Sequence, residues 1–250
     1  MTHSQSLSDT RSVTLVAVFA AMITVLDSIP VFPGFNSGVW DSWIFVLSPL
    51  VGIILGPVLG AISVGIGTFA GHLIFFRDPF EFFFILGAPL GSAAAGFLYR
   101  KKWIPVLGLY IVFIGAYAAY PISWQLPLWG IWDILAGFGL LLVFAILEKF
   151  TIDGNILVIR ERLYLAFITI ISLELDVLFR VFVFVPGQTY WIFYGLSVNQ
   201  LQILWSAAAL ITPLKIVIGT LVSMTLVPAI LKALNEIDGS GNSPPATSSQ

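Results

Sequence analysis

The chain has 250 residues, of which 58% are hydrophobic and 10% charged, and its mean hydropathy is +1.00. Soluble domains carry about 25% charged residues, so these charges are too few to cover a soluble fold. The net charge of −2 and the lack of a basic stripe exclude a nucleic-acid partner. Without cysteine there are no disulfides, thiolate metal sites or cysteine nucleophiles. We therefore expect an all-α integral membrane protein of the cell membrane, with no metal or cofactor.

In chain order, a polar N-terminal tail, residues 1–12, precedes the first apolar run. This run ends in Asp27-Ser28-Ile29-Pro30 without a small-x-small cleavage site, so we interpret it as a retained helix and not a cleaved signal peptide. A membrane-spanning helix needs about 20 apolar residues. The sequence predicts a polytopic helical bundle of about eight apolar segments, approximately 13–29, 43–55, 57–76, 82–99, 103–121, 127–147, 163–185 and 204–231.

The second segment is short for a full crossing, and only Gly56-Pro57 separates it from the third. This spacing allows either a tight helical hairpin or one broken helix, because irregular backbone is tolerated at membrane depth where protein covers it. The transmembrane domain is expected to span residues 13–232. The Gly/Ser/Pro-rich tail, residues 236–250, is expected to be disordered.

Lysine and arginine indicate the orientation of the bundle, because cytoplasmic loops carry an excess of both. With eight crossings, only Arg77 falls in a loop on the outer side. Both termini are therefore predicted to be cytoplasmic. The residues that fall on the cytoplasmic side are Arg11, Arg100, Lys101, Lys102, Lys149, Arg160, Arg162 and Lys232.

Small residues recur at helix-packing spacing in the second, third and fourth segments. One row is Gly52-x3-Gly56-x3-Gly60, a second is Gly67-x3-Gly71, and the fourth segment carries two adjacent rows. Such rows let helix backbones approach closely. They indicate internal packing or, alternatively, a surface for another membrane protein.

Ionisable side chains in hydrocarbon are costly unless paired or hydrated, so each is a candidate functional residue. In the seventh segment Asp176 and Arg180 are four residues apart and can pair on one face. Glu174 points elsewhere, and Lys215 of the eighth segment is its expected partner. His72 and Asp133 lie towards the outer ends of their segments.

These polar residues collect at mid-depth and in the outer half, which indicates a cavity that opens to the outside. The outer loops 30–42 and 186–203 combine aromatic and amide side chains, as small-ligand sites do. Alternatively, the charges are ion pairs that fix helix register, Asp133 is merely hydrated, and the loops are ordinary interfacial segments. The candidate substrate-binding residues are Asn36, Trp40, His72, Asp133, Glu174, Asp176, Arg180 and Lys215.

The chain has no GxxxxGK[ST] loop, no HExxH and no GxSxG, so no catalytic role is expected. Its two halves show no obvious repeat, which weakens the case for a self-sufficient secondary transporter.

Residues 13–100 resemble the substrate-binding S components of energy-coupling factor (ECF) vitamin transporters. The resemblance rests on an AxxxA row, Ala17 to Ala21, on Pro30 and Pro33 in the next loop, and on the Gly-punctuated stretch from Gly56 to Gly71. It implies a subunit that binds a vitamin or micronutrient outside the cell. It also implies docking through Ala17 and Ala21 onto a transmembrane coupling protein that carries two cytoplasmic ATPase subunits. The usual core of the family has six helices, and its third helix often carries a polar or acidic residue where this chain has Thr68 and His72.

Two other classes of function are weighed beside this one. The first is a self-contained transporter or channel driven by ions or protons at Glu174, Asp176, Arg180 and Lys215. The second is a membrane-embedded enzyme or an assembly subunit. Uptake that depends on ATP would support the ECF hypothesis over a self-contained transporter or channel. Product formation from a lipid or peptide would identify a membrane-embedded enzyme.

Overall fold

The computed structural model describes residues 9–31, 42–76, 78–150 and 158–241, and every regular element in them is helical. One isolated bridge pairs Pro30 with Ser42. The elements are α1 (Asp9–Asp27), the 3₁₀ helix η1 (Trp43–Val46), α2 (Ser48–Leu55), α3 (Pro57–Ile74), η2 (Pro79–Phe84), α4 (Gly87–Tyr99), α5 (Trp103–Ala119), η3 (Pro121–Gln125), η4 (Leu128–Ile131), α6 (Trp132–Phe150), α7 (Val158–Phe184), α8 (Thr189–Ile192) and α9 (Val198–Gly241).

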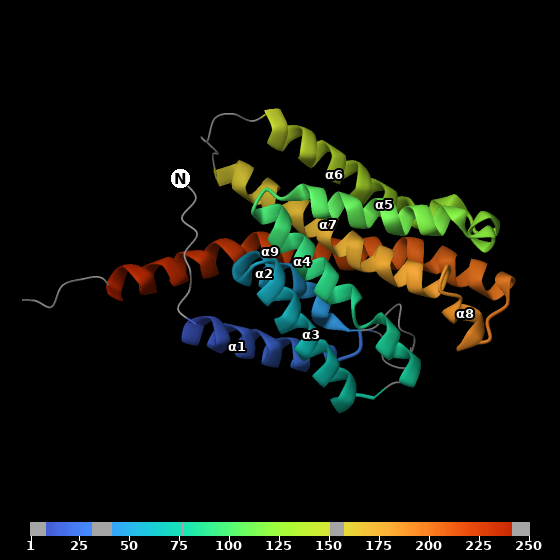
Figure 1. Cartoon of the computed structure of the whole chain (residues 1–250), viewed down its shortest axis with the longest axis horizontal. Helices are drawn as coiled ribbons and strands as arrows, with labels where there is room; N and C mark the ends of the chain where they lie inside the picture. Colours follow the sequence, from blue (N-terminus) through green and yellow to red (C-terminus); the bar gives the residue numbers. More distant parts are fainter. Residues whose placement is uncertain (1–8, 32–41, 77, 151–157, 242–250) are drawn as a thin grey trace, which may run out of the picture.

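The helices form a bundle with α7 and α9 near its middle (Figure 1). On one side α4 packs against α7, and α3 and α1 follow outward; on the other side α5 and α6 pack against α7. The start of α1 and the end of α9 lie towards one end of the bundle, and α8 lies at the other (Figure 1). We call these the terminal end and the α8 end.

Successive long helices alternate in direction. Ser63 of α3 donates a hydrogen bond to the carbonyl of Val16 in α1 (2.9 Å), and His72 lies 2.6 Å from Asp27, so α1 and α3 run in parallel. The closest approaches between α4 and α7 join Gly87 to Arg180 and Gly91 to Ser172, which makes this pair antiparallel. These contacts fix the relative directions of α1 and α3 and of α4 and α7.

The expected all-helical fold is confirmed for the described residues, and several helices suit a membrane. Five helical stretches are long and apolar enough to cross one: Thr10–Asp27, Pro57–Ile74, Pro79–Tyr99, Leu128–Lys149 and Val198–Glu236. Large apolar side chains such as Val58, Leu73 and Leu210 are exposed on the outer faces. Lipid tails solvate such faces favourably, so the helices indicate a membrane protein.

The second and third predicted segments form a tight helical hairpin, one of the two arrangements that the sequence allowed. Gly56 joins them with φ of 91° and ψ of 174°, and its N–H donates to the carbonyl of Gly52 (2.9 Å). This backbone region is essentially restricted to glycine. A Cβ on Gly60 would lie 2.7 Å from Gly52 Cα, so the absence of side chains allows the two helices to touch.

The small-residue rows of α3 and α4 pack inside the bundle. A Cβ on Gly67 would lie 2.6 Å from the carbonyl oxygen of Ala20, and one on Gly91 would lie 2.8 Å from that of Ser172. The fit of α1 against α3 and of α4 against α7 therefore depends on these glycines. Of the two interpretations offered by the sequence, internal packing holds for these rows.

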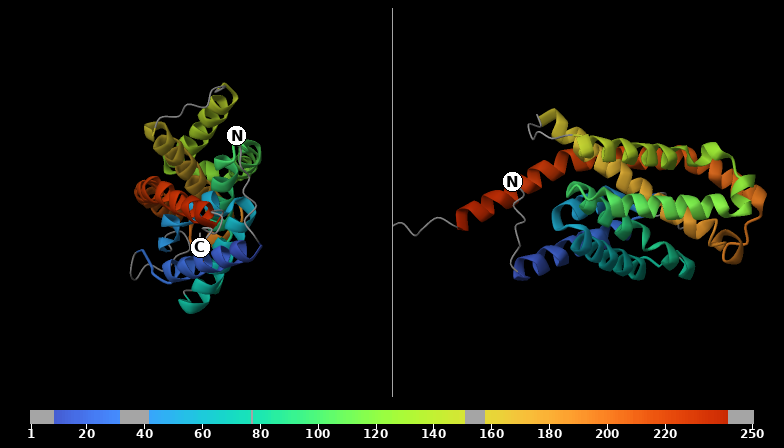
Figure 2. Two further views of the ribbon diagram at one scale, coloured as in Figure 1. Left: turned by 90° about the vertical axis from the view of Figure 1, so that its left-hand side faces the viewer. Right: turned by 45° about the horizontal axis from the view of Figure 1, so that its top comes forward.

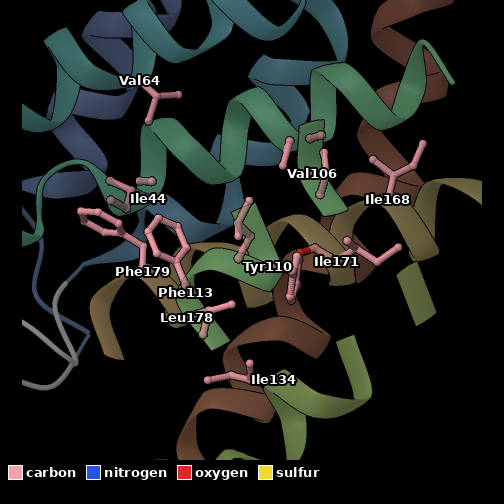
Figure 3. Packing of buried hydrophobic residues seen from close by; sticks show 14 of the residues in the cluster. Ile44, Val64, Val106, Tyr110, Phe113, Ile134, Ile168, Ile171, Leu178 and Phe179 are labelled. Carbon is pink, nitrogen blue, oxygen red and sulfur yellow. The ribbon is translucent and has the colours of Figure 1, made fainter. Parts of the chain in front are cut away.

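The core lies where α4, α5 and α7 meet. Figure 3 shows Tyr110 among buried apolar residues that include Val106, Phe113 and Ile171. The Tyr110 hydroxyl donates a hydrogen bond of 2.7 Å to the carbonyl oxygen of Ile171. A fully buried tyrosine thus has its polar atom satisfied, as burial requires.

Both termini of the helical region differ from the predicted boundaries. α1 starts at Asp9, inside the expected polar tail, and α9 continues to Gly241, into the segment expected to be disordered. The helix thus includes residues 236–241 of the segment that the sequence assigned to the tail, and residues 242–250 lie outside the described part. Extending an existing helix adds one hydrogen bond per residue, and Lys232 pairs with Glu236 at 3.8 Å across one turn. The 44 residues of α9 give a length of about 66 Å, and the helix projects beyond the bundle (Figure 2).

Candidate functional site

α7 carries the candidate site because it is the central helix and holds three buried charged residues, Glu174, Asp176 and Arg180. Their exposed fractions are 3%, 6% and 8%. α4 presents glycine to two of them, since a Cβ on Gly87 would overlap Asp176 Oδ1 and would lie 3.2 Å from Arg180 Nε. The small-residue row on α4 therefore makes room for charged side chains as well as for the α7 backbone.

The predicted pair between Asp176 and Arg180 is confirmed. Arg180 Nε donates a hydrogen bond to Asp176 Oδ1 at 2.7 Å, one helical turn away. This distance is typical of a charge-assisted hydrogen bond. Both residues are buried, so removing either would leave the other charge in a poorly solvated position.

Charged residues from three helices meet at one cavity near the α8 end. We call it the charge-lined cavity, and its volume is about 50 Å³. Two acidic and two basic side chains line it together with Trp205 and Thr212: Asp133 of α6, Asp176 and Arg180 of α7, and Lys215 of α9. This volume holds only a few water molecules, because one needs roughly 10–15 Å³ of such space.

Trp205 adds a hydrogen-bond donor and an aromatic wall to the charge-lined cavity. Its ring stacks on Tyr117 with centroids 5.8 Å apart and planes 2° apart. Its indole Nε1 is buried and has no hydrogen-bond partner among the described residues. Gly130 is required beside it, since a Cβ there would overlap the indole ring. The cavity thus offers charges of both signs, an indole N–H and an aromatic face.

The expected pair between Glu174 and Lys215 is wrong. Lys215 lines the charge-lined cavity, and its Nζ lies 5.2 Å from the centre of the Phe45 ring. Glu174 lines a different space, and its Oε2 has no hydrogen-bond partner in the described part of the chain. Glu174 and Asp176 are two residues apart, about 200° around the helix, so the two carboxylates face different neighbours.

The space beside Glu174 is a groove of about 240 Å³ between α6, α7 and α9. We call it the α6/α9 groove. Asp133 and Ile216 line both this groove and the charge-lined cavity, so the two spaces adjoin. Asp133 is 5% exposed and accepts a hydrogen bond from the Ile134 N–H at 2.9 Å. Asp133 is therefore buried within the bundle and lines both spaces.

His72 belongs to a separate buried cluster that joins α1, α3 and η2. Its Nδ1 lies 2.6 Å from Asp27 Oδ2, and its Nε2 lies 3.6 Å from Glu81 Oε2. Ser42 donates a hydrogen bond to Asp27 Oδ1 at 2.8 Å. His72 lines neither the charge-lined cavity nor the α6/α9 groove. Its placement as a substrate-binding residue is therefore not supported, and its contacts are those of a link between helices.

The structure thus brings together four of the predicted residues, Asp133, Asp176, Arg180 and Lys215, at the charge-lined cavity. Glu174 lies outside this cavity and shares only the α6/α9 groove with Asp133, and His72 lines neither space. Asn36 and Trp40 lie outside the described residues. Sequence reasoning missed three residues, each of which carried a signal. Asp27 ends the first apolar run, Glu81 is the one acid in an aromatic stretch, and Trp205 carries an indole N–H near the start of the last apolar run.

Ala17 and Ala21 lie on the exposed side of α1, whereas Ala20 and Ile23 are buried against α3. Val18, Met22 and Val25 are exposed beside them. This side of α1 is therefore apolar, carries small residues and is covered by no other described element. We call it the α1 face.

Among the described residues, no group of three or more histidine and acidic side chains is arranged to hold a metal ion. The chain matches no protein-family model, no curated protein and no solved structure. The arrangement of its own side chains is thus the basis for assigning a function.

Proposed function

We propose that this protein is a membrane-embedded binding subunit that captures a small organic solute, as the S component of an ECF-type uptake system does. The observation that carries the proposal is the convergence of Asp133, Asp176, Arg180 and Lys215 on one cavity. Buried charges at membrane depth are expensive, and they are typically kept where a solute or ion is bound. The mixture of cations, carboxylates and an indole N–H suits a polar solute with an aromatic or apolar part.

The proposed orientation places the charge-lined cavity on the outer side. Eight helices, α1 to α7 and α9, follow one another in alternating directions. We propose that the chain crosses the bilayer or most of it at each of them, at α2 only together with η1, because the eight residues of α2 are about 12 Å long. Arg11, Lys101, Lys149 and Lys232 then share the terminal end, and an excess of basic residues is typical of the cytoplasmic side. The α8 end faces outside, where a scarce nutrient is captured.

In this proposal, solute binding requires the charge-lined cavity to widen. Its volume of about 50 Å³ is far below the size of a vitamin. Arg180 and Lys215 carry long side chains that can change rotamer, and the pair between Arg180 and Asp176 would then open towards the solute. Such rearrangement is common where a ligand replaces a protein ion pair with its own charged group.

The α1 face is the proposed docking surface for a transmembrane coupling protein with two cytoplasmic ATPase subunits. Exposed Ala17 and Ala21 permit close approach of a partner helix. The chain itself has no nucleotide-binding loop, so energy would come from the partner.

Native mass spectrometry of the purified protein tests the binding role directly. We expect a co-purified small molecule whose mass adduct is lost in the Lys215→Gln variant and kept in the Lys232→Gln variant. Lys232 lies at the terminal end and is 80% exposed, so it controls for the loss of one positive charge. An adduct that both variants keep, or none after expression in rich medium, contradicts the proposal.

A self-contained transporter or channel is the second candidate. It is favoured by Glu174, whose Oε2 has no hydrogen-bond partner among the described residues. A carboxylate without a partner can take up and release a proton or cation during transport. Uptake by the protein alone in vesicles, abolished by a protonophore and independent of ATP, would select this function. Uptake that requires added ATPase subunits selects the first.

A further inference from the structure

The charged residues described in the lining of the α6/α9 groove are all acidic, whereas acidic and basic residues both line the charge-lined cavity. Two carboxylates line it, Asp133 and Glu174, and no lysine or arginine occurs among its described lining residues. The rest of its wall is mostly apolar, with Ile170, Val217 and Leu221 among the contributors. An acidic centre in apolar surroundings favours a ligand that is positively charged at one point and apolar elsewhere.

Two buried polar atoms in the groove accept no hydrogen bond from the described residues. They are Glu174 Oε2 and Thr220 Oγ1, and their residues are 3% and 8% exposed. Threonine in a helix usually bonds the carbonyl one turn earlier, as Thr225 does with Leu221 at 2.8 Å. Buried acceptors are costly when unsatisfied, most of all when charged. Both atoms are therefore suited to hydrogen bonds from a ligand donor.

The rim of the groove lies on the outer surface of the bundle. Trp132, Val217 and Leu221 line the groove and are 50%, 54% and 59% exposed. Pro213 lacks the N–H that would bond to Ala209, and the Trp132 indole donates to that carbonyl at 2.9 Å. This bond joins α6 to α9 beside the groove. Because this rim is apolar and exposed, we expect a ligand to enter the groove from the lipid and not from water.

We propose that the α6/α9 groove binds a hydrophobic primary ammonium ion that enters sideways from the bilayer. Its ammonium group would donate hydrogen bonds to Glu174 and Thr220 and compensate the charge of Asp133. Its hydrocarbon chain would lie along Val217 and Leu221. The volume of about 240 Å³ is about five times that of the charge-lined cavity, enough for a short alkyl chain. This site is additional to the proposed solute cavity and stands without it.

Calorimetric titration of the purified protein in a neutral detergent tests the groove with n-octylammonium at pH 7. The two controls, n-octanol and octanoate, keep the chain length and change only the head group. A charge-assisted hydrogen bond is worth tenfold or more in affinity, about 1.4 kcal/mol for each factor of ten. We therefore expect octylammonium to bind at least tenfold more tightly than octanol, and octanoate not to bind.

Variants assign this preference to the groove. Glu174→Gln keeps the shape of the side chain and is expected to abolish the preference for octylammonium while leaving octanol binding unchanged. Thr220→Val is isosteric, and we expect it to weaken octylammonium about threefold, the effect of one hydrogen bond. Glu148→Gln is the matched control, because Glu148 pairs with Lys101 at 3.2 Å outside the groove. Each ligand partitions into the detergent micelles to the same extent in every titration. This partition therefore cancels when the affinity of one ligand is compared between the wild-type protein and a variant.

Equal affinities for octylammonium and octanol would overturn the proposal. So would a folded Glu174→Gln protein that keeps the preference, since the carboxylate would then only be a protonated structural group. If Glu174→Gln does not fold, the Thr220→Val protein decides, and wild-type affinity for octylammonium in it refutes the site. None of these results depends on whether a solute binds in the charge-lined cavity.

Discussion

Removing the Asp176–Arg180 pair one residue at a time separates a structural role from a binding role. In the Asp176→Asn protein, Arg180 stays buried and loses the oxygen that lies 2.7 Å from its Nε. In Arg180→Gln it is Asp176 that loses this hydrogen bond, and Lys215 remains in the same cavity. Stranding one member of a buried pair costs about 3–5 kcal/mol. Gly87 lies directly over the pair, so little local rearrangement is available to reduce this cost.

The double variant Asp176→Asn/Arg180→Gln removes one charge of each sign and leaves Asp133 and Lys215 in the cavity to balance each other. We expect it to be more stable than either single variant, because replacing both members of a buried pair by neutral groups is often close to neutral. If Arg180 contacts a solute anion, the double variant still loses affinity at least tenfold, the effect of one charged hydrogen bond. Our prediction is recovered stability together with lost binding.

The measurements are thermal unfolding in detergent and affinity for the solute identified by mass spectrometry. Lys101→Gln/Glu148→Gln is the control pair, because Lys101 is 61% exposed and such a bridge contributes at most about 1 kcal/mol. A stable double variant with wild-type affinity would refute the binding role and leave only a role in helix register.

Three further predictions concern topology, docking and the hairpin. Single cysteines at Ser4 and Ser248 should both react only with membrane-permeant reagents; labelling of one by an impermeant reagent would mean an odd number of crossings. Ala21→Trp should abolish uptake and preserve solute binding to the isolated protein, whereas wild-type uptake would show that the α1 face is not a docking surface. Gly56→Ala should destabilise the fold by about 1–3 kcal/mol, since φ is 91° there, and unfolding is compared with Gly108→Ala, where an added Cβ meets nothing within 4 Å. Equal unfolding of the two alanine variants would refute the constraint at Gly56.

Interactions within one helix could be predicted from the sequence because helix geometry alone determines them. The spacing of Asp176 and Arg180 places both on one face, and the pair forms. Glycine followed by proline likewise predicted a break at Gly56, although the sequence allowed either a hairpin or one broken helix there. The positions of most helices could likewise be predicted, since long apolar runs are their main determinant.

Interactions between helices could not be predicted in the same way. Whether Lys215 meets Glu174 or Asp176 depends on how far α9 is rotated and shifted against α7. The contact between Asp27 and His72 requires the parallel register of α1 and α3, which Gly67 and Gly71 set by their close approach to α1. Periodicity identifies which residues share a face, but not which helix that face meets.

The start of α9 was missed for a local reason. The prediction began at residue 204 because Asn199, Gln200 and Gln202 interrupt the apolar run, and the helix begins at Val198. Ser197 and Gln200 form reciprocal bonds, with the Ser197 N–H donating to Gln200 Oε1 at 2.9 Å. This Ser-x-x-Gln pattern is a capping box, and it was visible in the sequence.

Asp176 and Glu174 lie on two different faces of α7, and we expect a ligand to bind differently at each. Asp176 faces a cavity where two carboxylates and two cations balance, so a solute there competes with an existing ion pair. Glu174 faces a groove with a second carboxylate and no cation among its described lining residues. A ligand gains most where the protein leaves a charge uncompensated, because it displaces no protein partner. On this argument a positively charged ligand in the α6/α9 groove should bind without the rearrangement that the charge-lined cavity requires.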